Sequence, residues 1–267
     1  MKKIPFLTIA LFFHICISAQ NQQLSYQYST LNAHSHNDYA NVTPFRLAYN
    51  NHFGSIEADI WAVDSNLFVA HNRADIKPDR TLDALYIEPV VELFTENKGQ
   101  AWSDQQSTFQ LLIDLKTPVE PTLSLLVEKL KKYPEVFDPK VNVNAVRIVI
   151  TGNRPDPSDF HYYPEFIFFD GILKMKYDEK QLKRVALYSE NLRNIISWNG
   201  VGEINEKEKI KLQSVIDSVH SIDKKIRFWN APDNINAWST LINMRSDYIN
   251  TDQIVKLSEY LISRGKQ

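Results

Sequence analysis

Histidines and carboxylates stand at alternating positions in two short segments of the chain. His34 and His36 are two residues apart at the end of one apolar run, and the next run contains Glu57 and Asp59 with the same spacing. Alternate residues of a strand point to the same side, so each pair is expected to face one way. Imidazole exchanges protons near neutral pH, and adjacent carboxylates repel each other unless a cation or proton lies between them. The pattern predicts acid–base chemistry beside a hard divalent cation, Mg²⁺ or Ca²⁺.

Three further residues extend this pattern. His71 closes the run 67–70, which follows a turn at 64–66 and is expected to be a returning strand. Asp114 and Lys116 are two apart at the end of another apolar run, so they should share a face. Asp114 would be a third oxygen ligand, and Lys116 would offset the negative charge of a phosphate. A salt bridge between neighbouring strands is the other interpretation of that pair, and a single histidine such as His71 is often structural.

The first two pairs also have simpler interpretations. A polar surface loop would explain the histidines, and an exposed edge strand would explain the carboxylates. The apolar residues that alternate with the carboxylates, Ile56, Ala58 and Ile60, favour a buried strand instead.

The elements that must position these residues are short apolar runs alternating with helical patterns. The expected strands are Leu31–His36, Ser55–Ala62, Gln110–Leu115, Val146–Thr151, Phe166–Asp170, Asn194–Ser197, Lys225–Trp229 and Asp247–Asn250. The expected helices are Thr43–Asn51, Thr81–Glu96, Pro121–Tyr133, Glu179–Tyr188, Glu206–His220, Asn234–Met244 and Thr251–Arg264.

This alternation predicts an α/β fold, a single-domain (β/α)₈ TIM barrel whose functional residues lie at the carboxyl ends of the strands. An open doubly wound sheet is the alternative. The chain contains no Gly-x-Gly-x-x-Gly motif for a dinucleotide.

The N-terminus and the composition bound the class of protein. Residues 1–19 combine Lys2 and Lys3 with an apolar stretch and the small residues Ser18 and Ala19, the pattern of a cleavable signal peptide. We therefore expect a secreted or periplasmic chain with one domain over residues 20–267, without a cysteine after Cys16. An uncleaved anchor is the alternative. No basic block is present for nucleic acid, and no second apolar segment is long enough to span a membrane.

The combined order of these motifs resembles the glycerophosphodiester phosphodiesterases, within the phosphatidylinositol-phospholipase-C-like phosphodiesterase superfamily. The matching parts are His34 or His36, Glu57-Ala58-Asp59, His71 and Asp114-Leu115-Lys116. The chain is most similar to a branch related to the fungal "altered inheritance of mitochondria" phosphodiesterase-like proteins. The marks of that branch are residues 34–39 and 57–61, Thr81-Leu82 with Leu85-Tyr86-Ile87, Arg227-Phe228-Trp229 and residues 248–252.

The resemblance spans residues 31–262 and implies a metal-dependent phosphodiester hydrolase. In that reaction His36 and His71 would serve as acid and base, with His34 as the substitute for His36. The metal would be held by Glu57, Asp59 and Asp114, and Lys116 would add positive charge. A glycerophosphodiester or a lipid headgroup would be the small-molecule substrate. The family's usual His-Arg-Gly is replaced by His36-Asn37-Asp38, so an arginine that would contact phosphate is missing there.

Two other functions fit parts of the sequence. A phospholipid-cleaving enzyme would need an exposed aromatic rim near the barrel mouth, and residues 160–163 are the candidate segment. A non-catalytic secreted barrel would bind a phosphorylated or sugar ligand, but the histidine pair and the three carboxylates favour catalysis.

Overall fold

The computed structural model describes residues 27–104 and 107–265. The expected signal peptide, residues 1–19, lies outside the described residues.

Eight parallel strands form the barrel, and their order around it is β8-β7-β6-β5-β4-β2-β1-β9. The ring closes between β8 and β9, where Arg227 pairs with Tyr248 in a parallel bridge and the Asp247 N–H donates to the Ile226 carbonyl over 3.0 Å. A further strand, β3 (Asn66–Val69), runs antiparallel to β2 outside the ring. The barrel strands are β1 (Ala33–Ser35), β2 (Ser55–Val63), β4 (Gln110–Leu115), β5 (Arg147–Gly152), β6 (Ile167–Gly171), β7 (Val185–Asn191), β8 (Lys225–Trp229) and β9 (Ile249–Thr251).

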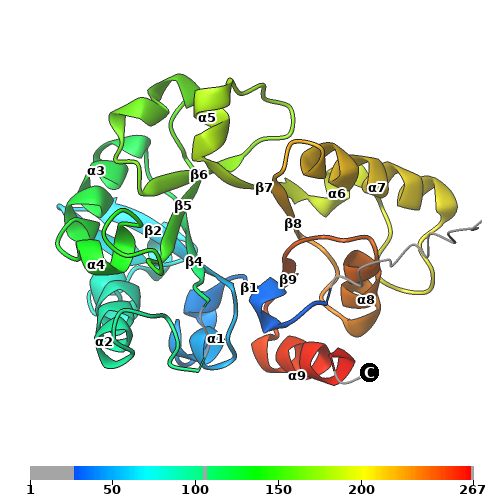
Figure 1. The fold of residues 1–267 in the computed structure, drawn as a ribbon, viewed down its shortest axis with the longest axis horizontal. Coiled ribbons are helices and arrows are strands. Elements are labelled where there is room, and N and C mark those ends of the chain that lie inside the picture. The colour runs from blue at the N-terminus through cyan, green and yellow to red at the C-terminus, as the bar shows by residue number, and fades with distance from the viewer. Residues whose placement is uncertain (1–26, 105–106, 266–267) are drawn as a thin grey trace, which may run out of the picture.

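Helices surround this ring (Figure 1). In the described part of the chain the α-helices are α1 (Arg46–Asn50), α2 (Glu88–Glu96), α3 (Val119–Leu130), α4 (Pro134–Phe137), α5 (Glu179–Arg184), α6 (Leu192–Ile195), α7 (Glu206–His220), α8 (Ile235–Asn243) and α9 (Ile254–Arg264). The prediction of a TIM barrel is confirmed, and the expected returning strand after residues 64–66 is β3.

Two hydrophobic clusters explain why the polar residues gather at one end. The larger cluster packs the outer faces of the strands against the helices, for example Ile56, Ile113 and Ile150. The smaller cluster consists of Leu112, Val149, Leu187 and Tyr248. The first three stand two residues before a polar residue on the same face of their strand, namely Asp114, Thr151 and Ser189. Tyr248 immediately precedes β9 and stands two residues before Asn250. An apolar layer therefore fills the barrel interior below a polar layer at the carboxyl ends.

The sixth barrel strand was placed wrongly from the sequence. The expected strand Asn194–Ser197 is replaced by β7, and the expected helix Glu179–Tyr188 ends at Arg184. Val185 and Leu187 are buried, and Leu187 belongs to the interior layer. Packing inside the barrel therefore makes this segment a strand, although its sequence continues the helical pattern of α5. The chain then turns into α6, because the Asn191 side chain accepts the Arg193 N–H as an N-cap.

The other expected strands each overlap an observed one, with smaller shifts at the ends of elements. The first strand is shorter than expected because Thr30–Asn32 is a 3₁₀ turn capped by Ser29. Helix α1 begins at Arg46 instead of Thr43, because Phe45 has a φ of 61° that cannot belong to a helix.

Candidate functional site

A cavity of about 360 Å³ lies at the carboxyl ends of the barrel strands. Its lining residues share a polar or ionisable character, apart from a glycine and a tryptophan. They are His36, Asn37, Glu57, Asp59, His71, Asp114, Lys116, Thr151, Gly152, Arg154, Asp170, Ser189, Arg227 and Trp229. This is the position at which TIM barrels place their functional groups.

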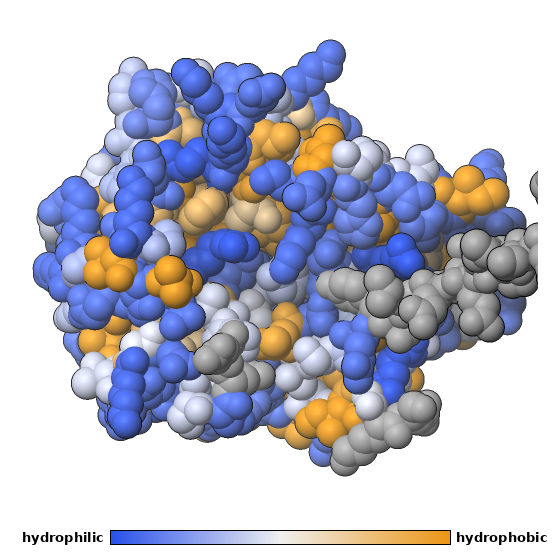
Figure 2. All heavy atoms as spheres, in the orientation of Figure 1, coloured by the Kyte–Doolittle hydropathy of each residue, from blue (hydrophilic) through white to orange (hydrophobic). Residues whose placement is uncertain are grey.

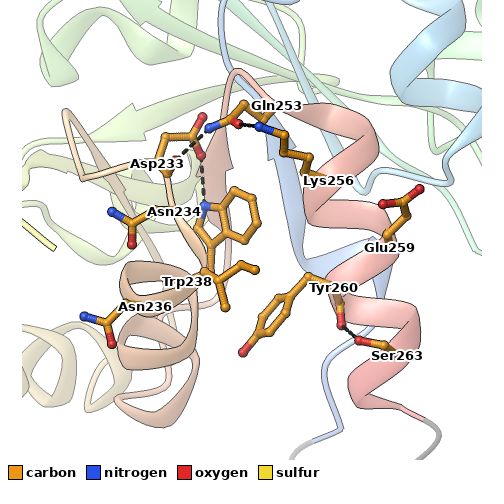
Figure 3. Close-up of a pocket in the computed structure, with 10 residues that line it drawn as sticks. Asp233, Asn234, Asn236, Trp238, Gln253, Lys256, Glu259, Tyr260 and Ser263 are labelled. Carbon is orange, nitrogen blue, oxygen red and sulfur yellow. Dashed lines mark hydrogen bonds between the residues drawn. The ribbon is translucent and has the colours of Figure 1, made fainter. Parts of the chain in front are cut away.

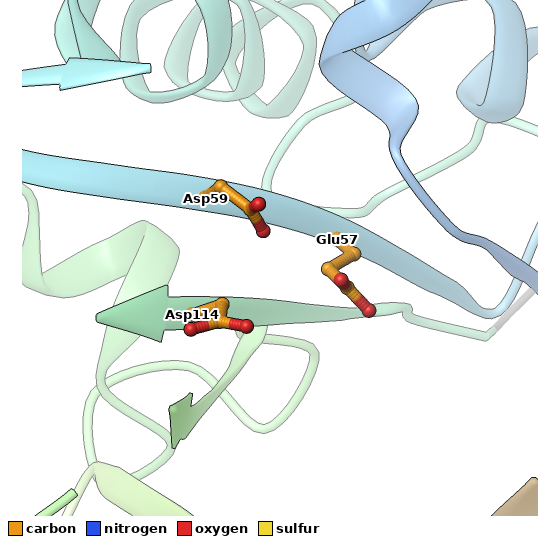
Figure 4. Close-up of side chains that lie close together, drawn as sticks. All are labelled: Glu57, Asp59 and Asp114. Atoms are coloured by element: carbon orange, nitrogen blue, oxygen red, sulfur yellow. The ribbon is translucent and has the colours of Figure 1, made fainter. Parts of the chain in front are cut away.

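Three carboxylates converge in this cavity. Glu57 and Asp59 lie on one face of β2, and Asp114 lies directly opposite Asp59 in the β2–β4 pairing (Figure 4). One oxygen from each lies within 4.8 Å of the others. Burial raises the pKa of Asp59 to about 6, and the charge of Glu57 acts in the same direction. The two carboxylates expected from the sequence to share a face do so, and both are buried.

Two cations hold these carboxylates. Lys116 Nζ lies 3.0 Å from Asp59 Oδ2 and 2.9 Å from Asp114 Oδ2, so it joins β2 to β4. Arg227 Nη1 lies 2.7 Å from Glu57 Oε2. Burial acts to raise the pKa of Glu57, but Arg227 and His34 outweigh it and hold that pKa well below its usual range. The sequence-based alternative for Lys116, a salt bridge between neighbouring strands, is therefore present in the structure.

His36 lines the cavity from the end of β1 with 27% of its side chain exposed. Its Nδ1 lies 2.8 Å from Oδ1 of Asp252, which follows β9. Burial acts to lower the pKa of His36, but the hydrogen bond to Asp252 and the charges of Glu57 and Asp252 raise it above the ordinary value. The second ring nitrogen is thereby directed away from Asp252, since the two nitrogens point in different directions.

His71 lines the same cavity from the segment after β3 and is more exposed, at 61% of its side chain. Its Nδ1 lies 3.2 Å from Asp59 Oδ2 and 3.0 Å from the Tyr39 hydroxyl. The Tyr39 hydroxyl also donates to Asp59 Oδ2 over 2.8 Å. Each of the two histidines therefore has one ring nitrogen held by a carboxylate.

His34 occupies a different place, fully buried beneath the cavity. Its Nδ1 lies 2.6 Å from Ser55 Oγ, and its Nε2 lies 2.9 Å from Glu57 Oε2 and 2.5 Å from Arg227 Nη1. Burial and the charge of Arg227 lower the pKa of His34 to about 3, so the ring is neutral at physiological pH. Both of its nitrogens are engaged inside the barrel.

The carboxylate cluster fits the divalent cation that the sequence resemblance implies. Oδ1 of Asp59 is buried, and none of the described residues donates a hydrogen bond to it. The three carboxylates carry one more negative charge than Lys116 and Arg227 offset. Carboxylate oxygens are the ligands that Mg²⁺ and Ca²⁺ prefer, and a bound cation would satisfy both the bare oxygen and the excess charge.

Gly152 lets the end of β5 approach this cluster closely. Its φ is +68°, and a Cβ at this position would lie 2.0 Å from Asp114 Oδ1. Only glycine tolerates both the backbone conformation and the contact. The absence of a side chain at Gly152 therefore leaves room for the Asp114 carboxylate in its observed position.

The other half of the cavity is lined by residues from the ends of β5, β6, β7 and β8. Asp170 on β6 accepts the Thr151 hydroxyl at Oδ2 over 3.0 Å, and Arg154 Nη1 lies 3.6 Å from the same oxygen. Arg227 was noted only within the motif 227–229, yet alternation along β8 places it on the same face as Trp229. That alternation is the signal that would have placed it in the barrel interior.

A wider cleft of about 800 Å³ lies between α8 and α9 (Figure 3). Trp238 and Tyr260 pack across it with ring centroids 5.9 Å apart. The Asp233 carboxylate accepts Trp238 Nε1–H and the backbone N–H of Asp252. The cleft is larger, but the carboxylate cluster and the histidines His36 and His71 lie in the strand-end cavity.

The aromatic segment considered as a lipid-binding rim does not line the cavity. Phe160 is buried against Phe169, with ring centroids 3.8 Å apart, whereas Tyr162 is 74% exposed. On the face shown in Figure 2, hydrophobic patches are separated by hydrophilic side chains. Among the described residues, no helix has both the length and the apolar character needed to cross a bilayer.

Comparison with known proteins supports the family expected from the motifs. Residues 22–170, more than half of the chain, match the model of the AIM6-like phosphodiesterase domain. Residues 225–253 match the glycerophosphoryl diester phosphodiesterase family.

Fungal relatives and one solved structure cover most of the chain. Altered inheritance of mitochondria protein 6 of Eremothecium gossypii is 25% identical over 85% of this chain and 68% of its own length. The Saccharomyces cerevisiae protein is 29% identical over 74% of this chain, which spans 61% of that relative. A glycerophosphodiester phosphodiesterase from Parabacteroides distasonis shares the fold, with a TM-score of 0.50, 14% identity and coverage of 84% and 90% of the two chains. The chain therefore belongs to the family of AIM6-like phosphodiesterase domains.

Proposed function

We propose that this protein is a metal-dependent phosphoric diester hydrolase that uses His36 and His71 for acid–base catalysis. The substrate would be a small glycerophosphodiester or a diester derived from a phospholipid. One observation carries the proposal: the two histidines line the same cavity as the three carboxylates, and each has one nitrogen held by a carboxylate. Family membership supports the reaction class, and the site supports the assignment of roles.

His36 is the proposed base. With Nδ1–H donated to Asp252, its Nε2 carries the lone pair that would accept a proton from the attacking hydroxyl, whether of water or of the substrate. The Asp252 carboxylate would stabilise the imidazolium that forms.

His71 is the proposed acid. It would keep Nδ1–H toward Asp59 and give the Nε2 proton to the leaving alkoxide. Its high exposure suits a group that must regain a proton from water after each turnover.

Glu57, Asp59 and Asp114 would hold the divalent cation, which supplies positive charge to the phosphate oxygens when bound. Lys116 would add a second positive charge beside them, because its ammonium already lies between Asp59 and Asp114. Arg227 keeps Glu57 ionised and oriented from below.

Hydrolysis of bis(p-nitrophenyl) phosphate by the chain from Gln20 onward tests the reaction class. The wild type is assayed with EDTA and then with added Mg²⁺ or Ca²⁺, beside Glu57→Ala and His71→Ala. We expect turnover that needs the metal and falls by about 10²–10⁴-fold in His71→Ala. Exposed residues away from the cavity provide matched controls, Glu96→Ala and His161→Ala, which should keep wild-type activity.

Turnover that survives EDTA, or that both His71→Ala and Glu57→Ala retain, would contradict the proposal. Glycerophosphocholine and a short-chain phosphatidylinositol, assayed under the same conditions, separate the two proposed substrate sources. Preference for the first would favour a soluble glycerophosphodiester, and preference for the second a phospholipid.

Export by the N-terminal segment is a separate proposal, resting on the sequence of residues 1–19. Expression of the full chain in a bacterial host, followed by N-terminal sequencing, tests it. A mature protein beginning at Gln20 outside the cytoplasm is expected. An uncleaved chain would contradict cleavage.

A further inference from the structure

The geometry points to a second subsite in the same cavity, which binds a hydroxylated ring, a sugar or cyclitol, attached to the phosphate. Asp170, Arg154 and Ser189 would bind its hydroxyl groups, and Trp229 would face the ring. This inference rests on the proposed function, since it names what the substrate carries beside its phosphate.

Asp170 is the observation that carries the subsite. The side chain is 1% exposed and lines the cavity, yet no described residue donates a hydrogen bond to its Oδ1. Burial raises the pKa of Asp170, against the opposing charges of Arg154 and Arg227. Hydrogen bonds from Ser189 and Thr151 act in the same direction as those charges, yet Oδ1 is left without a donor. A buried carboxylate oxygen without a donor is costly, so a donor is expected from a molecule in the cavity.

Arg154 supplies the complementary chemistry beside it. Its Nη1 donates to the Asp170 carbonyl over 2.6 Å and lies 3.6 Å from Asp170 Oδ2. Among the described residues no other nitrogen of this guanidinium has a recorded partner, although the group carries five N–H donors. A hydroxyl both donates and accepts hydrogen bonds, so two adjacent hydroxyls can donate a hydrogen bond to Asp170 and accept one from Arg154.

Phosphate itself does not fit this part of the cavity, because the Asp170 carboxylate would repel it. The anion is better placed near Lys116 and His36, on the ends of β4 and β1. Asp170 lies on β6, which is separated from β4 by β5. The subsite therefore takes the neutral group attached to the phosphorus.

Trp229 favours a ring over an open chain. It follows Arg227 on the same face of β8, lines the cavity and is 40% exposed. Indole is a rigid apolar surface, and the C–H face of a polyol ring is flat and weakly polar, so the two faces can pack while the hydroxyl edges reach polar side chains.

Titration calorimetry in the presence of Mg²⁺ tests the subsite without requiring turnover. The probes are glucose 1-phosphate and myo-inositol 1-phosphate, compared with cyclohexyl phosphate, which has the ring and the phosphate but no hydroxyls. We expect at least one hydroxylated probe to bind about tenfold or more tightly than cyclohexyl phosphate. Asp170→Asn and Arg154→Lys should reduce that ratio toward one while leaving the affinity for cyclohexyl phosphate within about twofold.

A matched control is Arg147→Gln, at the opposite end of β5 from Arg154, which should leave the ratio unchanged. Circular dichroism identifies a variant that fails to fold. If Asp170→Asn fails to fold, the binding ratio of Arg154→Lys tests the subsite.

Equal binding of all three probes, or a ratio that survives both substitutions, would overturn the subsite. A ratio that behaves as expected in a protein without phosphodiesterase turnover would uphold the subsite and contradict the proposed reaction instead. The probe that binds more tightly identifies the source of the ring.

Discussion

The two halves of the cavity rim differ in how completely their polar side chains are paired or hydrogen-bonded to one another. The ends of β9, β1, β2 and β4, together with the segment after β3, carry His36, Asp252, Glu57, Asp59, His71, Asp114 and Lys116, which are largely paired with one another. The ends of β5 to β8 carry Thr151, Arg154, Asp170, Ser189 and Trp229, where one carboxylate oxygen has no donor among the described residues. The first half carries the residues proposed for proton transfer and cation binding, and the second carries those of the proposed ring subsite.

Arg227 connects the halves. From β8 its Nη1 reaches Glu57 on β2 and Asn250 on β9, and its Nε lies 3.1 Å from Ser189 Oγ on β7. Within residues 27–104 and 107–265, one isolated bridge and two adjacent backbone hydrogen bonds join β8 to the start of β9. A buried guanidinium therefore links the two halves at the seam between β8 and β9.

The largest difference between the halves should appear with a substrate that has no hydroxyl groups. On bis(p-nitrophenyl) phosphate, His36→Ala should lower kcat by about 10²–10⁴-fold, because a positioned base is lost. Asp170→Asn should lower kcat by less than about tenfold, because this substrate has no hydroxyl groups that Asp170 could bind. Steady-state kinetics measures both. A larger loss in Asp170→Asn than in His36→Ala would erase the distinction.

Removing the connection should mainly affect stability. Arg227→Met leaves Glu57 buried without its cation, and breaking such a pair costs about 3–5 kcal/mol of unfolding free energy. Urea denaturation of this variant and of the exposed Arg73→Met gives the comparison, with the second expected within about 0.5 kcal/mol of wild type. Equal stability of the two variants would mean that Arg227 does not tie the halves together.

Gly152 tests the boundary between the halves. Gly152→Ala places a methyl group against Asp114, so Mg²⁺ affinity should fall by about 10–100-fold, the usual cost of disturbing the support of a metal ligand. Gly202→Ala is the matched control, because Gly202 also has a positive φ but no heavy atom within 4 Å of an added Cβ. Calorimetric Mg²⁺ titration that gives equal losses would attribute the effect to backbone strain alone.

The smallest expected effect is a shift in the pH dependence. The Asp252 carboxylate raises the pKa of His36 against the opposing effect of burial, so Asp252→Asn should lower it. A base must be deprotonated to act, so the acidic limb of the kcat profile should move to lower pH. Asp156→Asn, at an exposed carboxylate, should leave the profile in place. Movement of the alkaline limb instead would assign His36 as the acid.

The two halves also differ in how well the sequence predicts them. The first half follows from spacing, because Glu57 and Asp59 alternate with apolar residues along one strand and His36 stands two residues after His34. In the second half, Asp170 and Ser189 come from two neighbouring strands with no shared motif, and they meet through the pairing of β6 with β7. The strand β7, which the sequence did not predict, also lies in this half. Val185 and Leu187 continue the helical periodicity of α5, so the segment was expected to be helix.

The sequence also did not predict which residues hydrogen-bond to His34 and His36. His34 and His36 have the same type and neighbouring positions, but only the folded barrel buries the first among Ser55, Glu57 and Arg227. The pairing of His36 with Asp252 joins residues 216 positions apart. Such contacts follow from the order of strands around the ring, which local periodicity does not encode.

Anomalous diffraction from crystals grown with Mn²⁺, a substitute for Mg²⁺, tests the central claim most directly. The account predicts one strong peak bounded by Glu57, Asp59 and Asp114, with Lys116 Nζ displaced from at least one of the two aspartates. A cavity without such a peak, in which Lys116 still bridges Asp59 and Asp114 at saturating Mn²⁺, would contradict it.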